Sequence, residues 1–307
     1  MRKFIVVGGP TGSGKSDMAV ELAKRYHSGV ISADSVQVYR HFDIGSGKIT
    51  PQEMGGVTHH LLDVVDPLEE YTVKDFYEDA TAIIDDYNGR GRIPVVCGGS
   101  NLYVHALLYE LTFDEEPEAR KISLELEAIE GEEGPEALAK LLEAEAPEVF
   151  KTIDQKNPRR VFRALQQVRQ GIERPTQNLR RPRGDVRAPH LWLHWEREAL
   201  YDRINRRVDL MMEQGLLEEV RHLSREYPGA KGLSTIGYRE INDYLQGREY
   251  EDLSSAVEKV KQHSRNYAKR QITWGRKSQV IPIPMEQGRG EALAQGQKRV
   301  EEYYGSV

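Results

Sequence analysis

Short apolar runs alternate with longer amphipathic stretches over much of the chain. The apolar runs, rich in β-branched residues, lie at residues 4–7, 30–31, 61–65, 93–97, 191–195 and 280–283. Helical spacing of apolar positions fills several of the intervals, as between Met18 and Tyr26 and between Val73 and Tyr87. Strands that alternate with helices are typical of a parallel sheet covered by helices on both faces. The pattern therefore predicts an α/β fold.

The regular alternation ends after Leu111. Residues 112–189 contain no convincing strand pattern, and charged amphipathic segments separated by Gly and Pro predict helices instead. These helices are expected at Ala119–Ile129, Pro135–Glu145 and Pro158–Gln170. We therefore predict an all-helical insertion domain, residues 113–189, within a core formed by residues 1–112 and 190–307. Two long helical patterns, at residues 197–226 and 253–274, belong to the second part of that core.

The composition of the chain fits a soluble globular protein with more than one domain, since 38% of its 307 residues are hydrophobic and 30% are charged. No apolar run approaches the roughly 20 residues that cross a bilayer, and the N-terminus lacks the pattern of a signal peptide. We expect a cytoplasmic protein with no membrane partner. The single cysteine, Cys97, excludes an internal disulfide, and its apolar neighbours predict a buried, inert thiol.

The net charge of −6 conceals an uneven distribution of charge along the chain. Residues 114–148 hold thirteen acidic and three basic side chains, whereas residues 151–187 hold eleven basic and three acidic ones. Residues 259–277 add seven basic side chains and no acidic one. A basic segment is often only a solvated helix face, but two such segments on an acidic protein also fit contacts with nucleic-acid phosphates.

A glycine-rich motif directly follows the first apolar run and precedes a helical pattern. The motif G-x-x-x-x-G-K-[ST] is matched by Gly9, Pro10, Thr11, Gly12, Ser13, Gly14, Lys15 and Ser16. In such a loop the backbone N–H groups and the helix N-terminus face one anion, the lysine reaches the outer phosphate, and the serine ligates Mg²⁺. This context favours a ligand site over a glycine-rich turn without a ligand. The motif predicts a P-loop NTPase-like sheet but does not identify the phosphate compound.

Polar residues also follow two other predicted strands. Asp34 comes just after the second apolar run, and Gly98, Gly99 and Ser100 follow the run at residues 93–97. Ligands of an open parallel sheet bind outside the carboxyl ends of its strands, so we expect these residues near the P-loop. Asp34 could act there as a general base or as an outer-sphere partner of the metal, and Ser100 could offer a hydroxyl. Either residue could instead cap the turn or helix that follows, and for Ser100 both roles are compatible.

Several segments in a fixed order resemble the tRNA dimethylallyltransferase family. The core segments are GPTGSGKS at residues 9–16, ISADSVQVYR at residues 31–40 and VVCGGSNLYVHALL at residues 95–108. Further similarity lies in residues 157–165, 196–209, 234–240 and 267–274, so the resemblance runs from about Val6 to Arg276. A P-loop alone occurs in many families, whereas the ordered set is specific. One departure is mild, because Ser100 keeps the hydroxyl of a threonine that is frequent in the family.

The resemblance implies a prenyl transfer to tRNA. The family moves a dimethylallyl group from dimethylallyl diphosphate to N6 of adenosine 37, on the 3′ side of the anticodon, in tRNAs that read codons beginning with U. By this resemblance residues 9–16 would hold the substrate diphosphate rather than ATP, with Ser16 as the ligand of Mg²⁺. Asp34 would accept the proton of the amine, Lys15 would neutralise the diphosphate, and Ser100 would hydrogen-bond near the reacting base.

The same resemblance implies which residues contact the anticodon stem-loop of tRNA. The pocket of an adenine that has left its stack would be lined by Asp34, Ser35, Val36, Gln37 and Ser100. From the insertion domain, tRNA contacts would come from Arg120, Asn157, Pro158, Arg159, Arg160 and Val161. The protein is expected to act as a monomer.

Two other functions are compatible with parts of the sequence. A P-loop small-molecule kinase shares the glycine-rich loop and would use Asp34 to activate a hydroxyl for phosphoryl transfer. That class seldom needs a basic helical insertion. A regulatory RNA-binding NTPase would hydrolyse nucleotide and leave the RNA unmodified. The ordered set of motifs favours the prenyltransferase over both alternatives.

Overall fold

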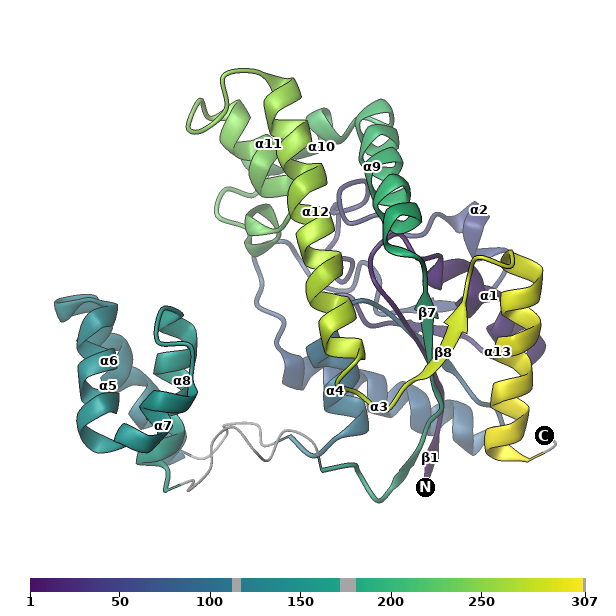
Figure 1. The fold of residues 1–307 in the computed structure, drawn as a ribbon, viewed down its shortest axis with the longest axis horizontal. Coiled ribbons are helices and arrows are strands. Elements are labelled where there is room, and N and C mark those ends of the chain that lie inside the picture. Colours follow the sequence, from purple (N-terminus) through teal and green to yellow (C-terminus); the bar gives the residue numbers. More distant parts are fainter. Residues whose placement is uncertain (112–116, 172–180, 306–307) are drawn as a thin grey trace. The chain divides into compact units, whose positions relative to one another are not determined.

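The chain folds into two compact units in the computed structural model, which describes residues 1–111, 117–171 and 181–305 (Figure 1). The core unit comprises Met1–Leu108 and Gly184–Val307. The insertion unit comprises Tyr109–Arg183. The insertion that the sequence predicted, residues 113–189, therefore begins and ends a few residues later than the compact unit does.

A parallel sheet of six strands lies at the centre of the core unit, in the order β4-β3-β5-β2-β7-β8. Its strands are β2 (Ile5–Gly8), β3 (Val30–Ser32), β4 (His59–His60), β5 (Val95–Cys97), β7 (His190–His194) and β8 (Ile281–Pro284). Every neighbouring pair is parallel, as the alternation of strands and helices predicted. The carboxyl ends of β2, β3 and β5 therefore open on one edge, where the loops that follow them can meet.

Two details of the strand prediction are wrong. The apolar run at residues 61–65 is not a strand, because Leu61 and Asp63 have φ angles of 60° and 55°, in the left-handed region that an extended chain avoids. The segment predicted to lack strands does contain one, since β6 (Val186–Arg187) pairs in parallel with β1 (Arg2–Lys3). A strand of 2 residues is too short to produce a hydrophobic pattern in the sequence.

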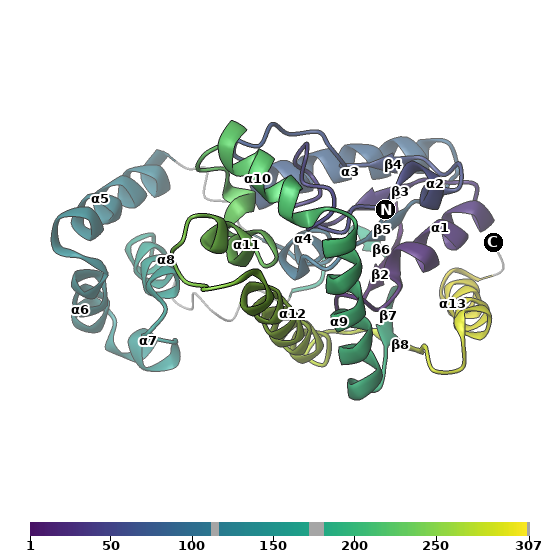
Figure 2. The same cartoon turned by 90° about the horizontal axis from the view of Figure 1, so that it is seen from above.

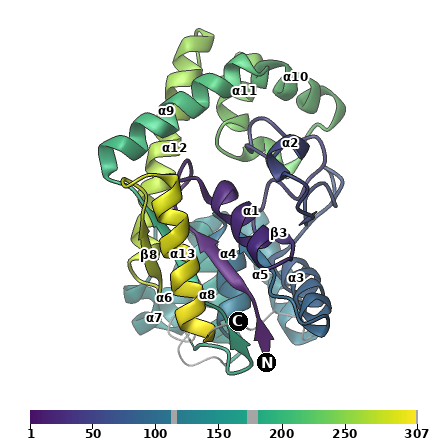
Figure 3. The same cartoon turned by 90° about the vertical axis from the view of Figure 1, so that its right-hand side faces the viewer.

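Helices cover both faces of the six-stranded sheet. They are α1 (Lys15–Arg25), α3 (Val73–Gly89), α4 (Asn101–Leu108) and α13 (Arg289–Tyr304). Helices α1 and α13 lie side by side and pack with Ile5 and Val7 in one hydrophobic core (Figure 3). Helices α3 and α4 pack with Val6 in the other. Successive residues of β2 point to opposite faces, so this strand contributes to both cores.

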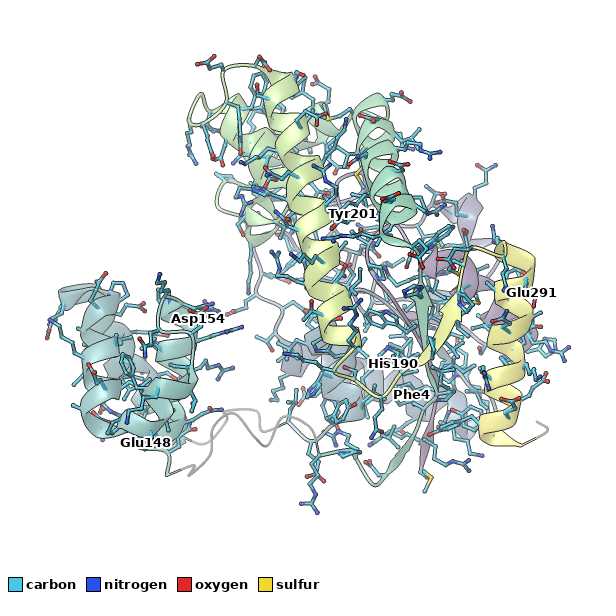
Figure 4. All side chains as sticks on the ribbon, viewed as in Figure 1. Phe4, Glu148, Asp154, His190, Tyr201 and Glu291 are labelled. Carbon is cyan, nitrogen blue, oxygen red and sulfur yellow. The ribbon has the colours of Figure 1, made fainter. Side chains whose placement is uncertain are left out.

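The residues beside β2 are tightly enclosed. Phe4 precedes β2 and is 1% exposed, and His190 at the start of β7 lies opposite Val6 (Figure 4). Burial lowers the pKa of His190 to about 3, so its ring is neutral at physiological pH. Cys97 at the end of β5 is buried, as predicted, and burial raises the pKa of its thiol to about 12. These groups therefore belong to the core and not to a reactive site.

Four further helices of the core unit pack against one another (Figure 2). They are α9 (Arg197–Glu213), α10 (Leu216–Glu226), α11 (Tyr238–Leu245) and α12 (Leu253–Gly275), and short helices α2 (Pro51–Met54) and η2 (Lys231–Ser234) lie in connecting segments. The single helix predicted over residues 197–226 is in fact two helices, because Gly215 has a φ of 102° and interrupts it. Helices α9 to α11 lie beyond the carboxyl end of β7 (Figure 1).

The described part of the insertion unit consists of helices. They are α5 (Pro117–Glu133), α6 (Pro135–Glu145), α7 (Pro147–Thr152) and α8 (Pro158–Arg169). They enclose a core of their own, in which Leu126, Leu138, Leu142 and Leu165 are each 0% exposed. The sequence predicted α5, α6 and α8 but missed the short α7. Within the described ranges of the whole chain, no helix is both long and apolar enough to cross a membrane.

Candidate active site

The glycine-rich loop connects β2 to α1, as the motif requires. Strand β2 ends at Gly8, and α1 begins at Lys15 with Gly14 as its N-cap residue. Because Gly14 has no side chain to cap the helix, N–H groups of the first turn remain for a ligand. Ser16 lies exposed in that turn. The helix dipole and these N–H groups together suit an anion.

Two amides of the loop are already paired within the protein. The Ser13 N–H donates to the Pro10 carbonyl over 3.2 Å, and the Thr11 N–H donates to Gln271 Oε1 over 2.9 Å. Trp195 Nε1 donates to the Ser13 carbonyl over 3.0 Å. These bonds fix the shape of the loop and occupy the Thr11 and Ser13 amides. The amides nearer α1 remain for an anion.

Lys15 reaches back over the loop. Its Nζ donates to the Pro10 carbonyl over 2.9 Å. Burial lowers the pKa of Lys15 to about 8, and the positive charge of Arg207 contributes in the same direction. The ammonium is therefore poorly solvated, and an anion bound in the loop would stabilise its charged form.

Arg207 on α9 brings a second cation to the loop. Its Nη1 donates to Thr11 Oγ1 over 2.8 Å, and its Nη2 lies 3.5 Å from the Ser46 carbonyl oxygen. Burial lowers the pKa of the Arg207 guanidinium, whereas the Asp34 carboxylate opposes that shift. No carboxylate in the described part of the chain lies within salt-bridge distance of it. Because a guanidinium stays charged in proteins, Arg207 is available to an anionic ligand.

Arg203, one turn earlier on α9, adds a third positive charge. Its Nε donates to the Gly12 carbonyl over 2.9 Å. Its guanidinium carbon lies 4.5 Å from the ring centre of Trp195, which is a cation–π distance. Helix α9 therefore presents two arginines to the same loop.

Asp34 follows β3 and shapes the turn there. Its Oδ1 accepts hydrogen bonds from the N–H groups of Val36 over 2.9 Å and Gln37 over 3.3 Å. The capping role that the sequence left open is therefore present. Oδ2 receives no hydrogen bond from the residues that the structure describes. That oxygen can still accept a proton, so the capping role and the role of a base are compatible.

Ser100 joins the end of β5 to the end of β3. The Ser35 N–H donates to Ser100 Oγ over 3.0 Å, and the two hydroxyl oxygens lie 3.2 Å apart. The Ser100 N–H donates to the Ala33 carbonyl over 3.2 Å. Gly98 permits this close approach, because a Cβ at that position would lie 2.0 Å from the Ala33 carbonyl oxygen. The two polar segments that the sequence placed at this edge therefore do meet.

A cavity of about 330 Å³ joins these groups. Its polar lining includes Thr11, Asp34, Ser35, Ser100 and Arg207. Its apolar lining includes Ile204, Val208, Met211, Ile236 and Val260. A cavity of this mixed character beside an anion site suits a ligand with a phosphate end and a hydrocarbon end.

Arg207 and Gln271 are site residues that were not predicted from the sequence. Gln271 is 1% exposed, and besides accepting from Thr11 it donates to the Gly99 carbonyl over 3.0 Å. Arg207 lies one turn from Ile204 and from Met211, both buried on α9. A polar or charged side chain on an apolar helix face must find a buried partner. That pattern was the signal that could have identified both.

The insertion unit presents several predicted tRNA contacts at its surface. Arg120 on α5 and Arg159 and Arg160 on α8 are exposed. Arg160 Nη1 lies 3.9 Å from the carboxylate of Asp154, which follows α7 (Figure 4). Arg163 Nη1 donates to Gln166 Oε1 over 3.2 Å. On this surface of α8, Arg159 and Arg160 are therefore more available to RNA phosphates than Arg163 is.

The other predicted contacts of this unit have structural roles. Asn157 is the N-cap of α8, and its Oδ1 accepts from the Arg160 N–H over 3.2 Å. Pro158 occupies the first turn, where its missing N–H costs nothing. Val161 is 1% exposed in the core of the unit. Its side chain is therefore enclosed by the unit, and the contact with RNA that was predicted for this residue would have to use its backbone.

Sequence comparison finds enzymes that are similar to nearly the whole chain. Residues 37–278 match the family model described as IPP transferase. A tRNA dimethylallyltransferase of Exiguobacterium sp. is 44% identical over 273 residues, covering 89% of this chain and 86% of that protein. The tRNA dimethylallyltransferase of Bacillus subtilis is 38% identical over 292 residues, covering 92% of each chain.

Solved structures give the same result for the fold. The full-length tRNA isopentenylpyrophosphate transferase of Bacillus halodurans superposes with a TM-score of 0.73 at 37% identity, covering 99% of this chain and 98% of that one. A eukaryotic dimethylallyltransferase acting on tRNA gives a TM-score of 0.80 at 27% identity, covering 97% of this chain and 78% of that one. The α/β fold with its inserted helices is therefore shared with these enzymes.

Proposed function

The chain belongs to the IPP transferase family, and on that premise we propose that it transfers a dimethylallyl group from dimethylallyl diphosphate to tRNA. The proposed acceptor is N6 of adenosine 37, beside the anticodon, in tRNAs that read codons beginning with U. The observation that supports this assignment best is one cavity that joins an anion-binding loop to a carboxylate with a free oxygen. Transfer between a diphosphate donor and a nucleophilic amine requires these two elements side by side.

The cationic end of the cavity suits the diphosphate of the donor. Lys15, Arg207 and the first turn of α1 would hold the two phosphates. Because Thr11 Oγ1 accepts a hydrogen bond from Arg207, its own hydrogen can be donated to a diphosphate oxygen. As the allylic C–O bond breaks, its electron pair leaves with the diphosphate, and fixed cations stabilise the growing negative charge.

Mg²⁺ is the cofactor that fits these residues. The exposed Ser16 hydroxyl lies in the first turn of α1, and hydroxyl and phosphate oxygens are ligands that Mg²⁺ prefers. We propose Ser16 as its protein ligand. When bound there, Mg²⁺ would neutralise part of the charge of the diphosphate.

The other end of the cavity suits the adenine. Asp34, Ser35, Val36 and Ser100 belong to its wall, and Gln37 lies in the same turn as Asp34. The N6 lone pair would form the new bond to the dimethylallyl carbon, and Asp34 Oδ2 would take the proton that N6 loses. The base must leave its stack to reach such an enclosed site.

The tRNA partner would be held largely through its phosphates. The exposed Arg120, Arg159 and Arg160 supply cations on the insertion unit, with Asn157 and Pro158 at the start of the same helix as the last two. The protein is proposed to act as a monomer. Because the substrate is tRNA, its proposed location is the cytoplasm.

The direct test uses dimethylallyl diphosphate, Mg²⁺ and unmodified tRNA with the purified protein. Mass spectrometry of the digested tRNA should show an adenosine heavier by one dimethylallyl group, and its formation should stop when Mg²⁺ is chelated. Product that forms equally well after chelation would refute the proposed cofactor, whereas a complete lack of modified adenosine would refute the reaction.

A P-loop small-molecule kinase is the alternative that the comparisons do not favour. The two functions differ in the ligand of the loop. Dimethylallyl diphosphate should displace a fluorescent ATP analogue at lower concentration than ATP does. Tight binding of ATP with rapid hydrolysis would support the kinase instead.

A further inference from the structure

A carboxylate on α10 holds a loop that forms part of the cavity wall. Glu219 Oε2 accepts from the Ile44 N–H over 2.7 Å, and its Oε1 accepts from the Gly45 N–H over 3.0 Å. Gly45 and Ser46 line the cavity, whereas Glu219 does not. Glu219 therefore acts on the cavity through its hydrogen-bond partners, the first of which is this loop, which we define as residues 44–47.

Tyr238 extends the same network to the next amide. Its hydroxyl donates to Glu219 Oε1 over 2.7 Å and accepts from the Ser46 N–H over 3.0 Å. The Tyr238 side chain is 0% exposed. Burial and the neighbouring carboxylate raise the pKa of Tyr238 well above its ordinary value, so the phenol keeps its proton and can donate. Three successive amides of the loop are thus fixed by one carboxylate and one phenol.

The carbonyl side of the loop contacts residues of the proposed reaction site. Gln37 Nε2 lies 3.2 Å from the carbonyl oxygen of Ser46 and 3.2 Å from that of Gly47. Arg207 Nη2 lies 3.5 Å from the Ser46 carbonyl oxygen. The loop therefore connects Glu219 and Tyr238 on one side to Gln37 and Arg207 on the other.

We propose that Glu219 is a positioning residue for the transfer reaction. Through residues 44–47 it sets the place of Gln37, and so the part of the cavity that receives the adenine. Its role in the reaction rests on the proposed function, whereas its effect on the loop does not. Misplacement of reacting groups by even about 1 Å can cost roughly a hundredfold in rate, so a remote carboxylate can matter in this way.

The test compares Glu219→Gln with Tyr238→Phe and with a matched control. In Glu219→Gln one acceptor oxygen remains, but an NH₂ group faces a loop N–H in place of the second oxygen. In Tyr238→Phe the hydroxyl that bonds Glu219 and the Ser46 N–H is lost. Glu218→Gln is the control, because Glu218 is the exposed neighbour on the same helix and pairs with Arg221. With both substrates saturating, the single-turnover rate should fall about tenfold or more in the first two variants. It should stay unchanged in the control.

Affinity separates positioning from simple loss of stability. Dimethylallyl diphosphate should bind each variant as tightly as it binds the original protein, because the P-loop is untouched and Arg207 keeps its 2.8 Å hydrogen bond to Thr11. The double variant should be no slower than the slower single variant, since both changes break one network. Normal rates in both single variants, or multiplied effects in the double variant, would overturn the proposal.

Hydrogen exchange tests the loop without any reaction. A peptide that contains residues 44–47 should exchange its amide hydrogens faster in Glu219→Gln and in Tyr238→Phe than in the original protein or in Glu218→Gln. Unchanged exchange in both would overturn the positioning role even if the protein transferred no prenyl group. Failure of the original protein to modify tRNA would by contrast count only against the proposed function.

Discussion

Arg207 Nη1 donates a hydrogen bond of 2.8 Å to Thr11 Oγ1, although the two residues lie 196 positions apart in the sequence. The bond brings a guanidinium from α9 to the glycine-rich loop of residues 9–16, and it leaves the hydrogen of the threonine hydroxyl available for donation to a ligand. It therefore links the helix that follows the insertion to the loop that follows the first long strand.

Replacing Arg207 should slow the reaction strongly. In Arg207→Lys the positive charge remains. The single ammonium group of lysine, however, cannot bond Thr11 and a phosphate at the same time as the forked guanidinium of arginine can. Loss of one preorganised donor at a developing charge typically costs about 10² to 10³ in rate. Single-turnover kinetics with saturating tRNA would measure it. Arg206→Gln is the matched control, because Arg206 is exposed on the same helix and its removal should leave the rate unchanged. Equal rates for Arg207→Lys and the control would contradict the role given to Arg207.

Asp34→Asn should affect the chemical step far more than tRNA binding. The amide oxygen can still accept from Val36 and Gln37, so the turn should persist, but an amide cannot take a proton at neutral pH. Loss of a general base typically lowers the rate by about 10² to 10⁴. Single-turnover rates and tRNA affinity should be measured on the same preparation. A variant with a nearly normal rate would show that Asp34 only shapes the turn.

Binding of dimethylallyl diphosphate should weaken as the pH rises through about 8. Burial holds the pKa of Lys15 near 8 in the protein without ligand, and an anion binds better to the protonated form and so raises that pKa. Affinity is therefore constant below this pH and falls above it. Calorimetric titrations between about pH 7 and 9.5 would measure the change. Lys15→Met should bind weakly and lose this pH dependence, and a pH dependence that survives in the variant would contradict the assignment.

The same lowered pKa has an effect of opposite sign on stability. Between about 8 and the ordinary lysine value of 10.5, the unfolded chain holds the Lys15 proton more fully than the folded protein does. The free energy of unfolding should therefore rise with pH in this window, as far as Lys15 contributes. Denaturant unfolding of the ligand-free protein and of Lys15→Met would measure the difference between them.

Neutralising the exposed arginines of α8 should weaken tRNA binding broadly, whatever the sequence of the tRNA. The slope of log affinity against log salt is negative. Arg159→Ala combined with Arg160→Ala should make it less steep, by roughly 0.7 to 0.9 for each phosphate that the variant no longer neutralises. Arg163 donates to Gln166 in the protein without RNA. If its side chain leaves Gln166 and binds an RNA phosphate, adding Arg163→Ala should reduce the steepness of the salt dependence further. Binding of dimethylallyl diphosphate should not change.

Lys140→Ala provides the control for this experiment, because Lys140 is an exposed cation on another helix of the same unit. An unchanged salt slope in the arginine variants would mean that this surface of α8 is only solvated. The phosphate contacts would then have to lie elsewhere, with the basic residues 259–277 as the next segment to test.

The sequence by itself determined those features that depend on neighbouring residues. Residues 9–16 form a glycine-rich loop between β2 and α1, as the motif predicted, because the glycines and the start of the helix act locally. The alternation of strands and helices is likewise a local pattern, and it predicted the parallel sheet. Two of the failures were local conflicts as well. A left-handed Leu61 interrupts an apolar run, and Gly215 breaks a helix whose apolar spacing continues past it.

Only the tertiary structure decided which distant side chains complete the site. Gln271 accepts from the Thr11 amide although 260 positions separate them, and Glu219 fixes a loop that lies 174 to 175 residues away. Nothing in a local pattern records such a partner, because it is set by how α9, α10 and α12 pack against the strand ends. Burial of a charge or an amide forces a partner to exist, but the packing of the helices chooses which one it is.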